Sequence, residues 1–199
     1  MNDIDVFLNM MEEDYYEEAN YKDEDYYEVF RKICLNYGDK SIEPYCLFID
    51  IINEEIPCEK YYMRMLMDVY SDYGIGEDFL EQLQMLIDEG YCVESQKEAR
   101  EIIKDHIQDG YIIAYRGEFA TKEYHNLDYK ESVSYSLTYD KAKHFATRFK
   151  MLPLVKSIVY TVKVPVEDVL AYIDREDEVV CLPICMDGKM QVIKEESFL

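Results

Sequence analysis

The amino-acid sequence predicts an α+β fold in which a helical first half is followed by a mainly antiparallel β-sheet. Apolar residues in the first half recur at the spacing of helix faces, whereas short β-branched and aromatic runs dominate from Gly110 onward. Helices first and strands second is the order typical of α+β proteins. We therefore expect an acidic helical region at 1–109, packed on a β core at 110–199.

The helical predictions come from apolar periodicity and from end signals. Helices are expected at about 24–36, 42–54, 59–73 and 76–89, the last with Phe79, Leu80, Leu83, Leu86 and Ile87 on one face. Gly90 is a suitable stop for that last helix. Tyrosines and carboxylates alternate in 12–30, which indicates a short helix or a partly mobile segment. Ser95 and Glu98 have the spacing of a capping box and predict the start of a further helix.

Strands are expected where apolar runs are short and rich in β-branched residues. These runs lie at 111–119, 132–138, 157–164 and 178–183. One helix interrupts them at 140–150, with Ala142, Phe145, Ala146 and Phe149 on one face. Asp187-Gly188 predicts a hairpin turn between 181–186 and 189–194.

Charge is distributed unevenly along the chain. The 199 residues carry a net charge of −22, and 49% of them are hydrophobic, enough for a buried core. Residues 1–110 hold 9 Lys/Arg against 29 Asp/Glu, whereas residues 111–199 hold 12 against 14. An acidic surface repels phosphate backbones, which argues against a nucleic-acid partner. It favours a protein partner with a basic surface, or it only keeps the protein soluble; both interpretations stay open.

The start of the sequence, its hydropathy and its cysteines together give an expectation for the cellular location. No run of roughly 18 uncharged apolar residues exists, so no membrane span is expected. The acidic start does not resemble a signal peptide, which predicts a cytoplasmic protein in its own cell or a host cell. The six cysteines are scattered and are expected to be reduced and mostly buried. Cys181 and Cys185 lack a second pair or a nearby histidine, so no metal site is expected.

Three short fragments of the second half carry chemistry-bearing residues. They are Tyr115-Arg116-Gly117, Ser134-Tyr135-Ser136 with the helix after it, and Glu176-Asp177-Glu178 before two valines. Alone, the first is compatible with an ordinary ion-paired strand residue and the last with a solvated acidic turn. Their order and context together favour a functional interpretation.

In this order the fragments resemble the arginine–serine–glutamate class of mono-ADP-ribosyltransferases, which includes bacterial toxins, phage enzymes and vertebrate ecto-enzymes. The resemblance covers about 110–183 and departs from the family at Tyr135, where threonine is usual. We expect this departure to reshape the pocket floor. The resemblance implies a split β-sheet core of the ADP-ribosyltransferase type, with NAD as substrate and no metal.

The resemblance assigns roles that fit the chemistry of NAD cleavage. Breaking the bond between nicotinamide and ribose develops positive charge on the sugar, which a carboxylate such as Glu178 stabilises. Ser134 matches the hydroxyl that orients this carboxylate, and Arg116 matches the guanidinium that binds the pyrophosphate. Gly117 is expected to let backbone approach the nicotinamide amide closely. Glu176 is expected to face the acceptor.

Further NAD contacts are expected from Ser136, Phe145 and Arg148. Arg148 also belongs to a basic cluster with Lys141, Lys143 and Lys150 in a stretch without acids. Such a cluster is either a landing site for an anionic dinucleotide or a solvated helix face.

The resemblance implies transfer of ADP-ribose from NAD to a target protein, with arginine as the expected acceptor because family members that carry both glutamates usually modify arginine. Such an enzyme would act as an intracellular effector: a toxin, a phage protein, or a defence or counter-defence protein. Two alternatives stay open. One is an NAD glycohydrolase that uses the same site with water as acceptor. The other is a non-catalytic acidic inhibitor that covers a basic surface.

Overall fold

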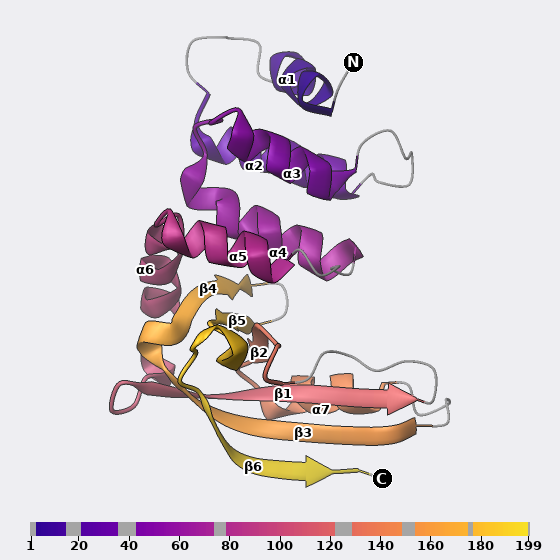
Figure 1. Ribbon diagram of the computed structural model, residues 1–199, viewed down its shortest axis with the longest axis vertical. Coiled ribbons are helices and arrows are strands. Elements are labelled where there is room, and N and C mark those ends of the chain that lie inside the picture. The colour runs from indigo at the N-terminus through magenta and orange to yellow at the C-terminus, as the bar shows by residue number, and fades with distance from the viewer. Residues whose placement is uncertain are drawn as a thin grey trace. The chain divides into compact units, whose positions relative to one another are not determined.

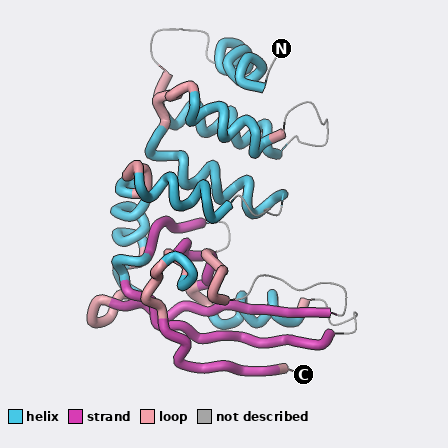
Figure 2. The backbone as a smooth tube through the Cα atoms, in the orientation of Figure 1, coloured by secondary structure: helices cyan, strands magenta, loops and turns pink. Residues whose placement is uncertain are grey.

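The computed structural model describes residues 3–14, 21–35, 43–73, 79–121, 129–148, 154–174 and 177–198. The chain divides into two compact units, Met1–Ser95 and Gln96–Leu199. The first unit is helical and the second contains a sheet, as Figures 1 and 2 show, so the mixed α and β content is confirmed. The division falls after Ser95, whereas the sequence placed it after residue 109.

Most helices of the first unit follow the predicted ranges closely, but the sequence did not predict the helix at Asp3–Asp14. They are α1 (Asp3–Asp14), α2 (Asp23–Leu35), α3 (Pro44–Asn53), η2 (Glu59–Tyr61), α4 (Tyr62–Tyr73) and α5 (Phe79–Asp88). Helix α4 contacts α2, α3 and α5, and α1 packs on α2 and α3. Their shared core contains the fully buried Phe7, Phe30 and Phe48. Gly90, the second residue after the end of α5, has a φ of +77°, which confirms the predicted stop.

Helix α6 (Val93–Ile102) begins before Ser95, so the predicted capping box is wrong. The Ser95 hydroxyl lies inside the helix and donates to the Cys92 carbonyl oxygen at 2.9 Å. Beyond it, Ala99 and Ile103 are buried in the core of the sheet. This packing explains why the second unit includes most of α6 and the short helix η3 (Lys104–His106). No helix in the described ranges is long and apolar enough to cross a membrane.

The second unit is built on a six-stranded sheet in the order β4-β5-β2-β1-β3-β6. The strands are β1 (Tyr111–Thr121), β2 (Ser134–Ser136), β3 (Leu154–Pro165), β4 (Val169–Ile173), β5 (Glu178–Cys181) and β6 (Gln191–Ser197). Every pairing is antiparallel, as expected. The sequence did not predict β4 as a separate strand; η4 (Val166–Asp168) turns the chain between β3 and β4.

The two faces of the sheet bury different cores. One face carries Ile112, Ala114, Tyr135, Val162 and Val179, which pack together with the end of α6. Helix α7 (Tyr139–Thr147) packs on the other face through Ala142 and Ala146, which confirms the apolar face predicted for them. Phe149, the last member of that predicted face, lies outside the described residues.

The predicted hairpin at Asp187-Gly188 is wrong. Strand β5 pairs with β2 and β4, whereas β6 pairs with β3. Asp187 does adopt the left-handed conformation that its sequence suggests, with φ +67°, but it ends the short helix η6 (Ile184–Met186). The local turn chemistry was correct, and burial of β5 between two other strands decided its partners.

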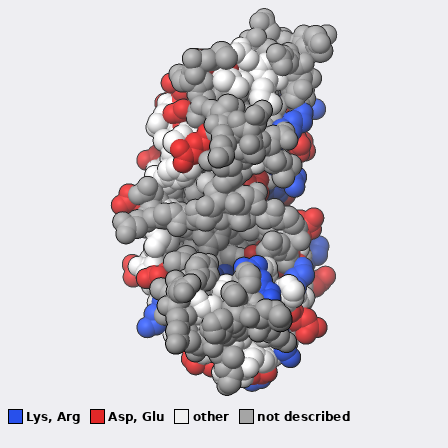
Figure 3. All heavy atoms as spheres, turned by 90° about the vertical axis from the view of Figure 1, so that its right-hand side faces the viewer, with Lys and Arg blue, Asp and Glu red and all other residues white. Residues whose placement is uncertain are grey.

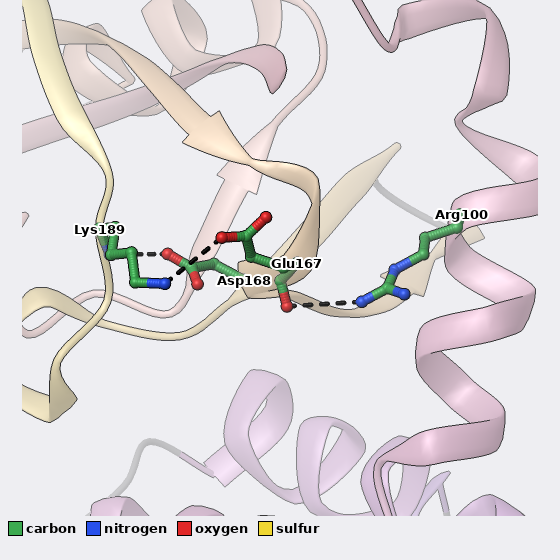
Figure 4. A network of polar contacts seen from close by, with 4 residues as sticks. All are labelled: Arg100, Glu167, Asp168 and Lys189. Atoms are coloured by element: carbon green, nitrogen blue, oxygen red, sulfur yellow. Dashed lines mark hydrogen bonds and ion pairs between the residues drawn. The ribbon is translucent and has the colours of Figure 1, made fainter. Parts of the chain in front are cut away.

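A buried carboxylate fixes the connection between β5 and β6. Asp168, 4% exposed, accepts a hydrogen bond from the Lys189 backbone nitrogen at 2.6 Å, and its carbonyl oxygen accepts one from Leu182 at 2.8 Å. Figure 4 shows this contact beside the Lys189–Glu167 ion pair and the Arg100 guanidinium on the Glu167 carbonyl oxygen. These bonds hold 182–190 against η4, at the end of the sheet where β4 begins.

Candidate active site

Three neighbouring strands bring the predicted residues together. Strand β1 meets β2 through the opposed residues Tyr115 and Ser136, and Ser136 in turn lies opposite Glu178 of β5. Directly opposed residues of antiparallel strands share a face of the sheet. Tyr115, Ser136 and Glu178 therefore form a row on one face, with Ser134 one step along β2.

Ser134 forms a hydrogen bond with Glu178, the predicted catalytic carboxylate. The buried Ser134 hydroxyl donates a hydrogen bond to Oε2 of the half-buried Glu178. Because Ser134 belongs to a short buried strand, its hydroxyl has little freedom and holds the carboxylate in one orientation. This pairing is the geometry that the sequence predicted for the two residues.

Arg116 reaches the same serine from β1. Strand alternation places its side chain on the face opposite to Tyr115. Its guanidinium nevertheless donates from Nη1 to the Ser134 carbonyl oxygen at 3.2 Å. Its Nε is buried and has no hydrogen-bond partner among the described residues. The guanidinium thus contacts the backbone of Ser134 from the face opposite to the Ser134–Glu178 side-chain pair.

Asp177 positions the start of β5, a role that the sequence did not predict. It has a φ of +53° directly before Glu178. Its carboxylate accepts a hydrogen bond from the Tyr172 hydroxyl at 3.1 Å and lies 3.7 Å from Lys141 Nζ. Its carbonyl oxygen accepts one from the Leu137 backbone nitrogen at 3.0 Å. The only sequence signal is that aspartate tolerates left-handed backbone better than most residues.

The other two residues of β2 have structural environments. The Ser136 Oγ accepts a hydrogen bond from the Thr138 backbone nitrogen at 3.4 Å, which leads the chain into α7. Tyr135 is fully buried in the core on the other face, and its hydroxyl donates to the Tyr129 carbonyl oxygen at 2.6 Å. The expectation that Tyr135 reshapes the pocket floor is therefore wrong, because alternation along β2 turns it away from Ser134.

Gly117 has a packing reason that the sequence did not show. A Cβ added to Gly117 would lie 1.9 Å from the Ala142 carbonyl oxygen and 2.9 Å from the Ala146 backbone nitrogen. The space left by the missing side chain is thus filled by α7 and is closed to a ligand on that side. Backbone contact of Gly117 with nicotinamide stays a prediction.

The predicted contacts on α7 form an aromatic and cationic group. The Arg148 guanidinium lies 5.0 Å from the centre of the Phe145 ring and 5.7 Å from that of Phe119. Lys141 pairs with Asp177, and Lys143 stands over the rings of Tyr139 and Phe198.

Two predicted members of the site cannot be placed. Glu176, the proposed acceptor-facing carboxylate, and Lys150 of the basic cluster lie outside the described residues.

The cysteines are free thiols, and four of the six are buried, which confirms the prediction that most are buried. Burial raises the pKa of the Cys58 and Cys92 thiols to about 12. No group of three or more His, Cys, Asp or Glu suited to a metal ion occurs within the described part of the chain.

Lys and Arg side chains lie beside Asp and Glu side chains on the face of the molecule that Figure 3 shows. Residues 111–199 hold 12 basic residues against 14 acidic ones. Comparisons of the chain with protein-family models, curated proteins and solved structures found no match.

Proposed function

We propose that the chain is an NAD-dependent mono-ADP-ribosyltransferase of the arginine–serine–glutamate class, acting on a target protein in the cytoplasm of its own or a host cell. The observation that carries this proposal is the hydrogen bond from the Ser134 hydroxyl to the Glu178 carboxylate, with the Arg116 guanidinium on the Ser134 carbonyl oxygen. One buried residue thus connects a carboxylate suited to a cationic sugar with a guanidinium suited to a pyrophosphate.

In the proposed reaction the C–N bond between ribose and nicotinamide breaks, and nicotinamide leaves with the bonding electrons. Glu178, held by Ser134, stabilises the positive charge that develops on the ribose. A guanidinium nitrogen of the acceptor then bonds to the same ribose carbon and loses a proton. Glu176 is the proposed group that orients the acceptor and takes this proton.

NAD binding is assigned to Arg116 and to the end of α7. The Nε of Arg116 is buried and has no partner among the described residues, and a pyrophosphate oxygen would satisfy it. Phe145 offers a ring face for nicotinamide, and Arg148 adds a cation directly beside that ring. Ser136 and Gly117 complete the proposed cofactor contacts from β2 and β1.

The test is incubation of the pure protein with NAD labelled in its adenylate part, together with a cell lysate. Two results together would support the proposal: nicotinamide is released, and a protein becomes labelled. Hydroxylamine should remove this label, as expected for a linkage to arginine. Glu195→Gln on β6, an exposed glutamate outside the site, is the matched control for Glu178→Gln. Release of nicotinamide without labelled protein would favour the glycohydrolase. No consumption of NAD would favour the non-catalytic acidic protein.

A further inference from the structure

A pocket of about 360 Å³ lies along the first half of β1. Its floor is formed by Tyr111, Ile113 and Tyr115, alternate residues that share one face of the strand. Asp105 and Asp109, from the segment before β1, contribute to its wall. Tyr111 and Ile113 are 36% and 39% exposed, which is unusual for large apolar side chains inside a sheet. We call these five residues the acceptor groove.

The acceptor groove lies on the same face of the sheet as the candidate active site. Tyr115 lies opposite Ser136, and Ser136 lies opposite Glu178, so all three project from the same face. Neighbouring strands are spaced by about 4.8 Å, which places Tyr115 roughly 10 Å from Glu178 across the sheet. A long side chain leaving a segment bound in the groove can span this separation.

The chemistry of the groove fits a cationic ligand. The Lys163 ammonium nitrogen lies 3.8 Å from the centre of the Tyr111 ring, so this aromatic floor already holds one cation of the chain itself. Two carboxylates, Asp105 and Asp109, line the pocket together with Lys163 and His106. An arginine side chain can stack its planar guanidinium on tyrosine and pair it with a carboxylate.

We propose that the acceptor groove binds an arginine-bearing segment of the target protein and directs an arginine side chain toward Glu178. This inference rests on the proposed function and specifies how that activity recognises its protein substrate. The aromatic floor supplies apolar contact, the two carboxylates select basic segments, and the row through Ser136 leads to the reacting carboxylate.

Direct binding of a peptide tests the groove independently of turnover. The probe is a fluorescent peptide of alternating arginine and glycine, with a glutamate–glycine peptide of equal length for comparison. In the full chain, Asp105→Asn with Asp109→Asn should weaken binding of the arginine peptide about fivefold, since each exposed charge pair contributes modestly. Asparagine tolerates the φ of +51° at Asp109, so the turn is kept. The matched control is Asp187→Asn with Glu195→Gln, which removes the same charge outside the groove and also replaces an aspartate of positive φ. This control should bind the arginine peptide as the wild type does.

A second pair of variants links binding to catalysis. Ile113→Arg places a cation in the groove and should raise the KM for arginine-peptide modification at least about tenfold. Ile193→Arg, at a more exposed isoleucine of β6, should leave that KM unchanged. Both variants should hydrolyse NAD without acceptor at the wild-type rate.

The outcomes separate the two proposals. Unchanged arginine-peptide binding in both groove variants, or tighter binding of the glutamate peptide, overturns the groove and leaves the transferase proposal standing. Failure of the wild-type protein to consume NAD overturns the transferase proposal, while the peptide measurement still decides whether the groove binds basic segments.

Discussion

Ser134 connects the other two residues of the candidate site. Its side chain donates to Glu178, and its backbone carbonyl oxygen accepts from Arg116. A serine in a strand carries almost no functional signal by itself, and Arg116 and Glu178 are far from it in the sequence. The three residues come together only because β2 lies between β1 and β5 in the sheet.

Substitutions of the two glutamates in the Glu-x-Glu fragment should remove different activities of the protein. Glu178→Gln should abolish transfer and NAD hydrolysis alike, because both reactions need the carboxylate at the ribose. Glu176→Gln should lose transfer to protein and keep much of the slow hydrolysis, because an arginine acceptor is protonated and needs a base. Nicotinamide release and protein labelling measure the two activities. Equal loss of both in a folded Glu176→Gln protein would contradict this division.

Arg116 should contribute mainly to binding of NAD. Replacing it with alanine should cost about 1.5–3 kcal/mol of NAD affinity, the usual contribution of a charge-assisted hydrogen bond. Calorimetric titration at constant salt measures this loss. Lys194→Ala removes an exposed cation from β6 of the same sheet and should bind NAD as the wild type does. Wild-type affinity in Arg116→Ala would exclude the proposed role.

The cysteines should differ in their reaction with an alkylating reagent at pH 8. Cys46 is exposed and should react first in the native protein. Cys185 is also exposed, but desolvation and Glu131 raise its pKa, so it should react more slowly. Cys58 and Cys92 should react only after unfolding, because burial blocks access and raises the pKa of both thiols to about 12. Peptide mapping by mass spectrometry gives the order; early labelling of Cys58 would contradict it.

At the level of elements, α7 packs so close to β1 that residue 117 of β1 must lack a side chain. The Ala142 carbonyl oxygen and the Ala146 nitrogen occupy the position where a side chain of residue 117 would begin. The sequence predicted the helix and its small buried alanines, but it gave Gly117 a ligand-related role. Close packing of a helix backbone on a strand supplies a sufficient reason for the glycine.

Gly117→Ala should therefore destabilise the second unit by about 3 kcal/mol, since the added methyl group meets immobile backbone. Gly110→Ala is the matched control: its φ is +81° but its surroundings are empty, so only the backbone cost of about 1 kcal/mol is expected. Urea unfolding followed by near-ultraviolet circular dichroism, which reports tyrosine packing, compares the two. A smaller loss in Gly117→Ala than in Gly110→Ala would refute the packing argument.

For the whole molecule, the uneven charge should govern association with a basic target. Residues 1–110 hold 29 acidic residues against 9 basic ones. Raising the ionic strength from about 0.01 M to 0.15 M shortens the Debye length from about 30 Å to 8 Å. The association rate should fall about tenfold or more over this range, because electrostatic steering is screened. Hydrolysis of NAD without acceptor is the internal control. If protein modification depends on salt no more than this hydrolysis does, the acidic half serves only solubility.

The sequence predicts those features of the fold that depend on residues close together along the chain. Periodicity and turn residues act within a few positions, so they correctly located α2, α5, α7, β1 and β3. The roles of Arg116, Ser134 and Glu178 in NAD cleavage came from a family resemblance and stay a prediction.

The tertiary structure decided which distant segments of the chain lie next to each other. It placed β5 beside β2 and not beside β6, turned Tyr135 into the core, and filled the space at Gly117 with α7. Each of these outcomes depends on which distant segments bury one another, and local sequence patterns carry no information on that choice. The bond between Ser134 and Glu178 follows from the same pairing of β2 with β5.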